Sequence, residues 1–263
     1  MDKKFNTLKI DMSHERVLVV TLNRPDVRNA INSEMMRELR DFWQEIFVHH
    51  EKIYCIVLTG SGSAFCAGAD LKERVNLDLV TWRAQHAVFE QAMLAMLDCP
   101  VPIIAAVNGA AFGGGLELAL ASDFIYAADT ATFAQPEVKV GIMPAALGTQ
   151  NLPRACGAAR AKELSFTGAA FSAHEAYEWG IVNKVCEHDL LVNEALATAE
   201  KICKNAPLAV CQVKKSINMS QQLDIKSGFA FEVEAYNRLL ETKDREEGIR
   251  AFNEKRSPIF TGE

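Results

Sequence analysis

Hydrophobic positions in the first part of the chain alternate between strand-like runs and helical repeats. Val17–Leu22 and Ile53–Thr59 are apolar, rich in β-branched residues and followed by turn residues, which is typical of buried strands. Between them, apolar side chains recur every three or four residues from Ser33 to His50. This spacing predicts a helix with Ser33 as its N-cap.

The middle of the chain repeats a strand, a glycine-containing turn and a helix. Ile103–Val107 predicts a strand, and an apolar helical stretch at Leu116–Ala121 follows the glycines at 113–115. Short strands are also expected at Phe124–Ala127 and Thr132–Phe133. This alternation predicts an α/β fold in which helices cover one or more sheets.

The pattern changes after Glu187. From Asp189 to Lys255 no strand-like run occurs, and apolar residues recur at helical spacing with few glycines. The segment 205–207 contains a proline and would separate two of these helices. We therefore expect an α/β core at residues 1–190 and a helical section at 191–263, which would cover the core or pack against other subunits.

Composition and charge exclude several protein classes. Of the 263 residues, 49% are hydrophobic and 24% are charged, which is ordinary for a globular protein and unlike disordered or collagen-like chains. The net charge of -6 gives no general attraction to nucleic acid or to an anionic membrane. An anionic ligand would therefore need a local cluster of basic residues.

Cysteine usage and hydropathy indicate the compartment. The seven cysteines are scattered without metal-binding spacing, which favours buried thiols in a reducing compartment. The N-terminal segment has no apolar run of the kind found in secretory signals. The uncharged stretch from Cys99 to Leu116 is interrupted by prolines and glycines and predicts buried core. We expect a cytoplasmic protein that does not enter the membrane.

Glu117 is the most informative single residue. It is the only charged residue between Asp98 and Asp123, and it follows three glycines in an apolar helical stretch. Burial of a carboxylate costs free energy and raises its pKa, so such a residue is retained mainly for a partner or a reaction. The alternative is a structural carboxylate that faces the helix dipole or pairs with a distant arginine.

Two segments offer small residues and free backbone amides near this carboxylate. The glycines at 113–115 precede a helix whose first N–H groups lack internal partners, and Ala64–Asp70 follows a strand through a short turn. Together they could hold one carbonyl oxygen. Glu137 alone is expected at the surface, but paired with Glu117 it could exchange protons with a substrate.

Other catalytic motifs are absent or incomplete. Gly60-Ser61-Gly62 follows a strand but Phe65 stands where the dinucleotide fingerprint needs its third glycine. No Walker A, HExxH or GxSxG motif occurs. The histidines, at 14, 49, 50, 86, 174 and 188, have polar neighbours and are expected at the solvated surface.

In combination these segments resemble the crotonase, or enoyl-CoA hydratase/isomerase, superfamily along nearly the whole chain. The resemblance implies an α/β fold built as a spiral of ββα turns, with a C-terminal helical trimerisation section and usually a dimer of trimers. The motifs that carry it are Asn23-Arg24-Pro25, Arg28-Asn29-Ala30, FCAGADLKER from Phe65 to Arg74, AAVNGAAFGGGLELALASD from Ala105 to Asp123, AQPEVKVGIMP from Ala134 to Pro144, Gly148-Thr149-Gln150 and the closing FNEKRSPIFTG.

The resemblance places an oxyanion hole on the backbone N–H groups of Ala67 and Gly114, and two catalytic carboxylates on Glu117 and Glu137. It implies reversible addition of water to a trans-2-enoyl-CoA, which gives a 3-hydroxyacyl-CoA through an enolate held by both amides. Glu117 would be the base toward water and Glu137 the proton donor to C2. Neither a metal nor a cofactor is implied, because coenzyme A is part of the substrate.

The resemblance also places residues along the coenzyme A molecule. These are Ala30, Asp70 and Leu71 for the pantetheine and adenine, and Arg28, Lys72 and Lys255 for the phosphates. For each of the three cations, a solvated surface position is the alternative.

One loop departs from the family pattern. Relatives often read Pro-Gly-Gly or Pro-Gly-Ala followed by Gly-Gly-Thr, whereas this chain reads PAALGT from Pro144 to Thr149. Leu147 is expected to narrow the acyl pocket. The alternatives are an isomerase or a dehydratase of a branched or functionalised acyl-CoA, similar to the methylglutaconyl-CoA hydratases, and a non-catalytic scaffold that binds acyl-CoA or RNA. Nucleic acid is the less favoured partner, because the helix at 33–50 is not lysine-rich.

Overall fold

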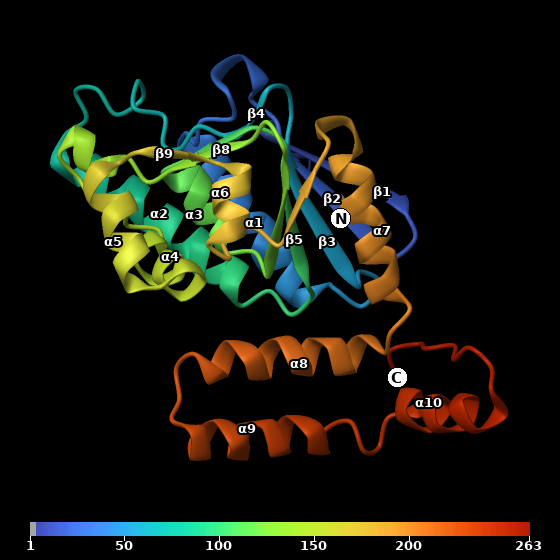
Figure 1. The fold of residues 1–263 in the computed structure, drawn as a ribbon. Coiled ribbons are helices and arrows are strands. Elements are labelled where there is room, and N and C mark those ends of the chain that lie inside the picture. Colours follow the sequence, from blue (N-terminus) through green and yellow to red (C-terminus); the bar gives the residue numbers. More distant parts are fainter. Residues whose placement is uncertain (1–3) are drawn as a thin grey trace.

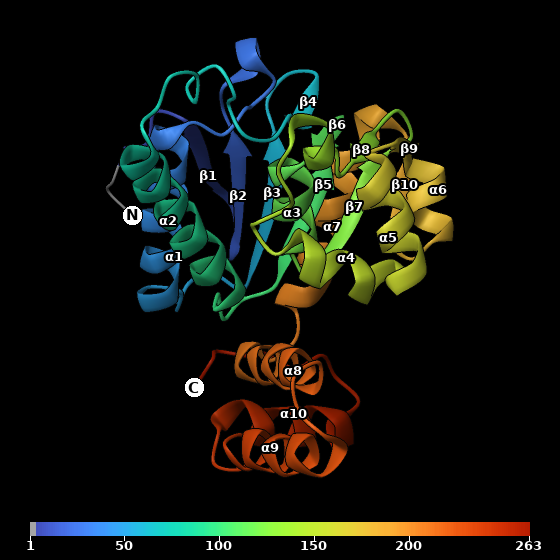
Figure 2. The same ribbon diagram turned by 90° about the vertical axis from the view of Figure 1, so that its left-hand side faces the viewer.

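Two β-sheets and the helices around them form the core (Figure 1, Figure 2). The structure is a computed structural model that describes residues 4–263, so the predictions about the N-terminal segment lie partly outside the described residues. The six-stranded sheet has the order β1 (Leu8–His14), β2 (Val17–Leu22), β3 (Cys55–Gly60), β5 (Ile103–Val107), β7 (Phe124–Ala128), β10 (Lys184–Cys186). The four-stranded sheet has the order β4 (Ala64–Cys66), β6 (Ala110–Phe112), β8 (Thr132–Ala134), β9 (Ala170–Ser172).

The connections between the sheets confirm the predicted spiral of ββα turns. In the large sheet, β1 and β2 are antiparallel, while β2, β3, β5, β7 and β10 are parallel. Parallel strands need crossover connections. The crossover from β2 to β3 contains only helical segments, and each later crossover contributes a strand to the small sheet before its helical segment. Thus β3 is followed by β4 and α2 (Leu79–Leu97), and β5 by β6 and α3 (Gly114–Leu120). The third turn runs from β7 through β8 to η2 (Glu137–Val140) and α4 (Gly148–Cys156).

Helix α1 (Ser33–Val48) shows how the hydrophobic pattern positions the core. Its apolar stripe is fully buried, and α1 packs against α2 and β1. Asn32, rather than the predicted Ser33, is the N-cap, because its side chain accepts a hydrogen bond from the N–H of Met35. The prediction was therefore one residue late at this end.

Helix α7 (Leu191–Cys203) moves the predicted boundary between the core and the helical section. Leu191, Ala195 and Ala199 are fully buried, and α7 packs on β2, β3, β5 and β7. In Figure 1 it lies on the opposite side of the large sheet from α1 and α2. The boundary predicted at residue 190 is therefore too early, because α7 completes the core and the chain leaves it only at residues 204–206.

The remaining helical elements complete the two parts of the chain. Within the core they are η1 (Pro25–Val27), α5 (Ala158–Thr167), α6 (Ala173–Glu178) and η3 (His188–Leu190). Below the core in Figure 1 lie α8 (Pro207–Ser220), α9 (Ile225–Asn237) and α10 (Lys243–Glu254). As expected, the segment 205–207 separates two helices, α7 and α8.

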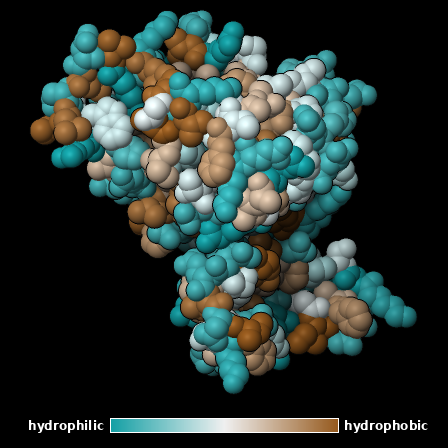
Figure 3. Space-filling model, turned by 60° about the vertical axis from the view of Figure 1, so that its left-hand side comes forward, coloured by the Kyte–Doolittle hydropathy of each residue, from teal (hydrophilic) through white to brown (hydrophobic). Residues whose placement is uncertain are grey.

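The helical section leaves apolar side chains in contact with solvent. Val213 and Ile217 on α8 are each 58% exposed, and Phe229 on α9 and Phe252 on α10 are 62% and 84% exposed. Figure 3 shows such apolar side chains at the surface of this section. Exposed apolar clusters of this kind mark interaction surfaces. Within residues 4–263, no helix is both long enough and apolar enough to span a lipid bilayer.

Candidate active site

A pocket of about 240 Å³ opens where the ββα turns meet. It is lined by the loop after β4, the start of α3, η2, the loop before α4 and one face of α2. The structure brings five of the predicted residues together in the lining of this pocket: Ala67, Leu71, Gly114, Glu117 and Glu137. The helices α2 and α3 lie in the left half of the core in Figure 1, away from α8–α10.

Glu117 lies in the first turn of α3 and is almost completely buried. Only 3% of its surface is exposed, and its Oε1 accepts hydrogen bonds of 2.8 Å from the backbone N–H groups of Ala146 and Gly148. Burial raises the pKa of Glu117 to about 7, although the two backbone hydrogen bonds act in the opposite direction. Its partner is therefore the main chain rather than a distant arginine, and it can change protonation state near neutral pH.

The turn before α4 is shaped to bring these two amides to one oxygen. Leu147, between the two donors, has φ 75°, a left-handed conformation that costs a residue other than glycine about 1 to 2 kcal/mol. A Cβ atom at Gly148 would lie 2.8 Å from Oε1 of Glu117. Glycine at 148 therefore avoids a steric clash with the carboxylate of Glu117.

Leu147 does not narrow the pocket as expected. Its side chain packs against the hydrophobic core, and Ala145 and Ala146 line the pocket in its place. The left-handed backbone at Leu147 turns its side chain away from the cavity. The departure from the family pattern therefore leaves small methyl groups at the pocket wall.

Glu137 begins η2 and is about half-buried. Its Oε1 accepts a 2.8 Å hydrogen bond from the side-chain amide of Gln135, which is itself fully buried. Its Oε2 is buried and has no hydrogen-bond partner among the residues that the structure describes. Burial raises the pKa of Glu137 above its ordinary value. This carboxylate is not the solvated surface residue expected from its own sequence context.

The two glutamates influence each other. The negative charge of Glu137 is one of the causes that raise the pKa of Glu117, although burial is the larger cause. The amide of Gln135 lies near both, because a Cβ atom at Gly148 would be 3.1 Å from its Nε2 and 2.8 Å from Oε1 of Glu117. The charge of Glu137 is thus a small addition to the effect of burial on the pKa of Glu117.

The start of α3 presents a free backbone amide to the pocket. Gly113 has φ 52° and ψ -121°, and its N–H donates to the carbonyl of Ala134. The next N–H, that of Gly114, has no hydrogen-bond partner in the described part of the chain. A Cβ atom at Gly113 would lie 3.0 Å from Oε1 of Glu137, so glycine keeps this turn clear beside the second carboxylate.

The second predicted oxyanion donor is not available at Ala67. Its backbone N–H donates to the carbonyl of Arg28 at 2.9 Å. This amide is therefore used within the fold, and the placement of the donor on Ala67 is corrected by the structure.

The amide of Ala69 is the free donor in this loop. Ile31 forms a parallel bridge with Ala69, and its main chain bonds to Gly68 and Asp70 on either side. In such a bridge the N–H of the central residue points away from the partner strand. A Cβ atom at Gly68 would lie 3.5 Å from the nitrogen of Gly114, so this loop and the start of α3 are adjacent.

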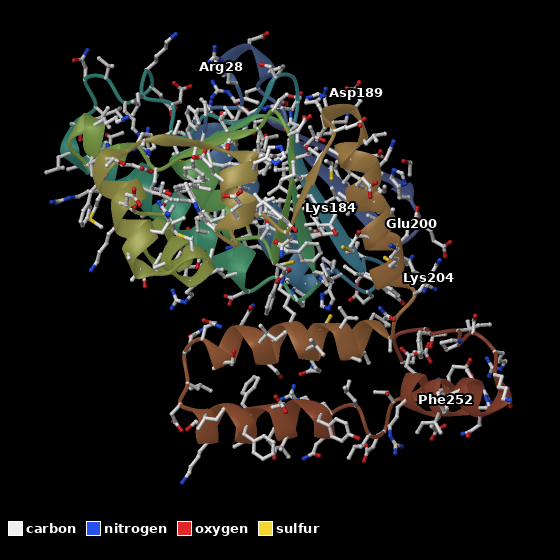
Figure 4. The ribbon with its side chains drawn as sticks, viewed as in Figure 1. Arg28, Lys184, Asp189, Glu200, Lys204 and Phe252 are labelled. Carbon is white, nitrogen blue, oxygen red and sulfur yellow. The ribbon has the colours of Figure 1, made fainter. Side chains whose placement is uncertain are left out.

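Three of the residues predicted along coenzyme A lie at or near the pocket mouth. Leu71 lines the pocket and is 49% exposed. Arg28 and Lys72 are exposed, and Figure 4 shows Arg28 at the top of the core. Their contact with phosphates remains a prediction.

Two other predicted residues are engaged within the fold. The carboxylate of Asp70 forms a 3.0 Å ion pair with Arg24, and the same guanidinium donates to the carbonyl oxygen of Ala30. Asp70 is therefore a structural residue that fixes the loop carrying Ala69. Ala30 is partly buried beside this pair.

Lys255 does not lie near the pocket of its own chain. It is the C-cap of α10, and in Figure 4 the α10 residue Phe252 lies far below Arg28. A contact between Lys255 and a ligand in this pocket would require a second copy of the chain. The contact of Lys255 with coenzyme A therefore remains a prediction.

One wall of the pocket has no counterpart among the predicted elements. Trp82, His86 and Phe89 line the pocket from one face of α2, and Arg74 lines it from the preceding loop. The expectation that His86 is a solvated surface residue is wrong, because its side chain is 18% exposed. The signal for this helix was the N-cap Asp78, whose side chain accepts hydrogen bonds from the N–H groups at 80 and 81.

Known proteins match this chain over almost its entire length. The pattern of the enoyl-CoA hydratase/isomerase family matches residues 12–263. YngF of Bacillus subtilis, provisionally named an enoyl-CoA hydratase/isomerase, is 43% identical, over 98% of this chain and 99% of its own. The short-chain-enoyl-CoA hydratase of Clostridium acetobutylicum is 40% identical, over 92% of each chain. The crystal structure of the enoyl-CoA hydratase of Bacillus anthracis superposes with a TM-score of 0.95 at 40% identity, over 98% of this chain and 100% of its own.

The fold and the pocket with its two glutamates define a member of the crotonase superfamily. The chain belongs to the enoyl-CoA hydratase/isomerase family.

Proposed function

We propose that the protein is an enoyl-CoA hydratase, which adds water reversibly to the double bond of a trans-2-enoyl-CoA and forms a 3-hydroxyacyl-CoA. The observation that carries this proposal is the presence of both Glu117, which is buried, and Glu137, which is half-buried, in one pocket, each with a raised pKa. Hydration needs one group to accept a proton from water and one to deliver a proton to carbon. Two carboxyls in one pocket supply both functions, and the relatives' names agree.

The oxyanion hole of the proposed reaction consists of the N–H groups of Gly114 and Ala69. Both amides are free in the described chain, and they come from adjacent loops. The thioester oxygen would accept both hydrogen bonds, which strengthen as negative charge develops on it during attack at C3. Removal of one such donor costs about 2.7 to 4 kcal/mol in other enzymes.

Glu117 is the proposed base. Its Oε1 is fixed by the amides of Ala146 and Gly148, which stabilise the ionised form, so the other oxygen can take a proton from water. Glu137 is the proposed donor to C2 through Oε2, which makes no hydrogen bond within the described chain. The reaction as proposed uses neither a metal nor a redox cofactor, and coenzyme A enters as part of the substrate.

The helical section supports a proposed assembly of trimers, alone or paired into a hexamer. The apolar residues exposed on α8 and α9 are numerous enough to form an interface, and burial of each large side chain would contribute about 1.5 to 3 kcal/mol. Lys255 is also not among the residues that line the pocket of its own chain. Light scattering across a concentration series tests the assembly.

The decisive experiment follows the loss of the enoyl-thioester absorbance of crotonyl-CoA. The wild-type protein should turn the substrate over, and Glu117→Gln and Glu137→Gln should each abolish most of this activity. Glu163→Gln, on the exposed surface of α5, is the matched control and should behave as the wild type. Binding of crotonyl-CoA without turnover by the wild-type protein would contradict the proposal and favour a scaffold.

A further inference from the structure

Arg74 is an unpaired, partly buried cation on the wall of the acyl pocket. Its guanidinium carbon lies 5.5 Å from the centre of the Trp82 ring. Burial lowers the pKa of Arg74, which shows that the guanidinium has lost part of its hydration. Among residues 4–263, Arg74 forms no ion pair and no hydrogen bond through its side chain. The N–H donors of this guanidinium are therefore available to a ligand.

The nearby carboxylates do not neutralise this cation. Glu73 is the only charged group of the described chain that affects the pKa of Arg74, and its Oε2 accepts a 2.8 Å hydrogen bond from the N–H of Ser33. Glu117 and Glu137 line the same pocket, but neither forms an ion pair with Arg74 among the described residues.

A second polar group shares this wall. The ring of His86 stacks on Trp82 with 5.1 Å between ring centres, and its Nε2 is 3.3 Å from Oε1 of Glu90. Its Nδ1 is buried without a partner in the part of the chain that the structure describes. The pocket lining also includes the apolar residues Leu71, Phe89, Val140, Ile142 and Met143 and one further cation, the exposed Lys139.

The position of this wall along the pocket follows from α2. A Cβ atom at Gly114 would lie 3.7 Å from the ring of Phe89. Phe89 therefore lies at the end of the pocket where the proposed oxyanion hole is. Trp82 lies two helical turns earlier on the same face, about 10 Å along the helix axis. Arg74, above Trp82, is therefore separated from the thioester position by roughly the length of a short acyl group.

We propose that the acyl pocket accepts an enoyl group that carries a carboxylate at the end distant from the thioester, and that Arg74 binds this carboxylate. The inference rests on the proposed hydratase function and names its substrate class. A guanidinium and a carboxylate form paired, charge-assisted hydrogen bonds that are stronger than neutral ones. An acyl chain that ends in a methyl group would leave the partly buried guanidinium without a partner.

The same cation could instead meet a phosphate of coenzyme A. The two arrangements differ in one measurable respect. A phosphate contact serves every acyl-CoA equally, whereas a contact with the acyl carboxylate serves only the substrate that has one. The effect of an Arg74 variant must therefore be compared between substrates of equal size.

The experiment measures kcat/KM for trans-glutaconyl-CoA, whose acyl group ends in a carboxylate, and for trans-5-methylhex-2-enoyl-CoA, its uncharged isostere. We expect the wild-type protein to prefer the carboxylate. Arg74→Met should reduce kcat/KM for glutaconyl-CoA by about 10- to 100-fold and change that for the isostere less than about threefold. Arg74→Lys should restore part of the preference, and Arg83→Met, on the exposed face of α2, is the matched control.

Three results would overturn the inference. Equal losses for both substrates in Arg74→Met would assign Arg74 to a coenzyme A phosphate. No loss for either substrate would show that Arg74 binds neither group, provided that the melting temperature of the variant is unchanged. A wild-type preference for the isostere would show that the pocket favours an acyl group with an apolar end. Failure of the hydratase proposal itself is distinct, because the wild-type protein would then hydrate neither substrate nor crotonyl-CoA.

Discussion

The two ends of the pocket consist of different groups: main-chain amides at the inner end and side chains at the outer end. At the inner end, main-chain amides of Ala146 and Gly148 hold Glu117, and further amides face the thioester position. At the outer end, the side chains of Arg74 and Trp82 form the wall. Main-chain geometry is fixed by the fold, whereas a side-chain wall changes with one substitution. We infer that the inner end determines the reaction and the outer end determines the acyl group.

The largest expected effect is at the inner end. Glu117→Gln keeps the size of the side chain but removes its capacity to accept a proton, so kcat should fall by about a thousandfold or more. Its KM should change little, because Glu117 holds water rather than coenzyme A. Steady-state kinetics with crotonyl-CoA measures both constants. If the variant kept a tenth of the wild-type kcat, the assignment of Glu117 as the base would be wrong.

Gly148→Ala should have the next largest effect. Its Cβ atom would lie 2.8 Å from Oε1 of Glu117 and 2.8 Å from the Cβ of Pro144, so the carboxylate or the turn must shift. A displacement of this size should lower kcat about 100-fold. Gly141→Ala is a useful comparison, because a Cβ atom there meets nothing within 4 Å, although its φ of 76° adds backbone strain. If Gly148→Ala were no worse than Gly141→Ala, close packing around Glu117 would not matter to the reaction.

The pH dependence of kcat tests the roles of the two carboxyls. The active form has Glu117 ionised, as the base, and Glu137 protonated, as the donor. Because the pKa of Glu117 is raised to about 7, Glu117 is protonated and inactive as a base at lower pH. We therefore expect kcat to rise with pH through about pH 7, whereas ionisation of Glu137 would lower it. A kcat that stays flat from about pH 5 to 8 would contradict this assignment.

The smallest expected effect is at the outer end. Trp82→Leu removes the ring beneath Arg74 and beside His86 but leaves the inner amides in place. We expect KM to rise about two- to fivefold and kcat to stay within a factor of two, because a single cation–π contact outside the deep interior contributes about 0.5 to 1 kcal/mol. Measurement with acyl-CoAs of graded length would show where along the chain the loss occurs. A large fall in kcat for crotonyl-CoA would contradict the separate roles of the inner and outer ends of the pocket.

The sequence predicted the inner end better than the outer end, and the reason is physical. Glu117 stands alone in an apolar stretch, so its burial could be expected before its partners were known. The free amide of Ala69 could not, because the bridge to Ile31 that uses the neighbouring amides joins segments far apart in the chain. Arg74 and His86 look like surface residues in sequence, and only the packing of α2 turns them toward the pocket.

The fold was predictable in its repeats but less so at its boundaries. Strand β5 and helix α1 follow from hydrophobic periodicity, because their apolar faces are buried. The boundary at residue 190 was misplaced because the pattern of α7 is helical like that of α8, and only the burial of Ala195 and Ala199 shows that α7 belongs to the core. Periodicity reports that a face is apolar, but not what it packs against.

The most direct test of the account is to incubate the wild-type protein with crotonyl-CoA in ¹⁸O-labelled water and to weigh the product by mass spectrometry. Hydration predicts a 3-hydroxybutyryl-CoA that contains one labelled oxygen on its acyl group and that is not formed by Glu117→Gln. Crotonyl-CoA recovered without labelled oxygen, or altered only in the position of its double bond, would contradict the assignment of the two glutamates to the addition of water.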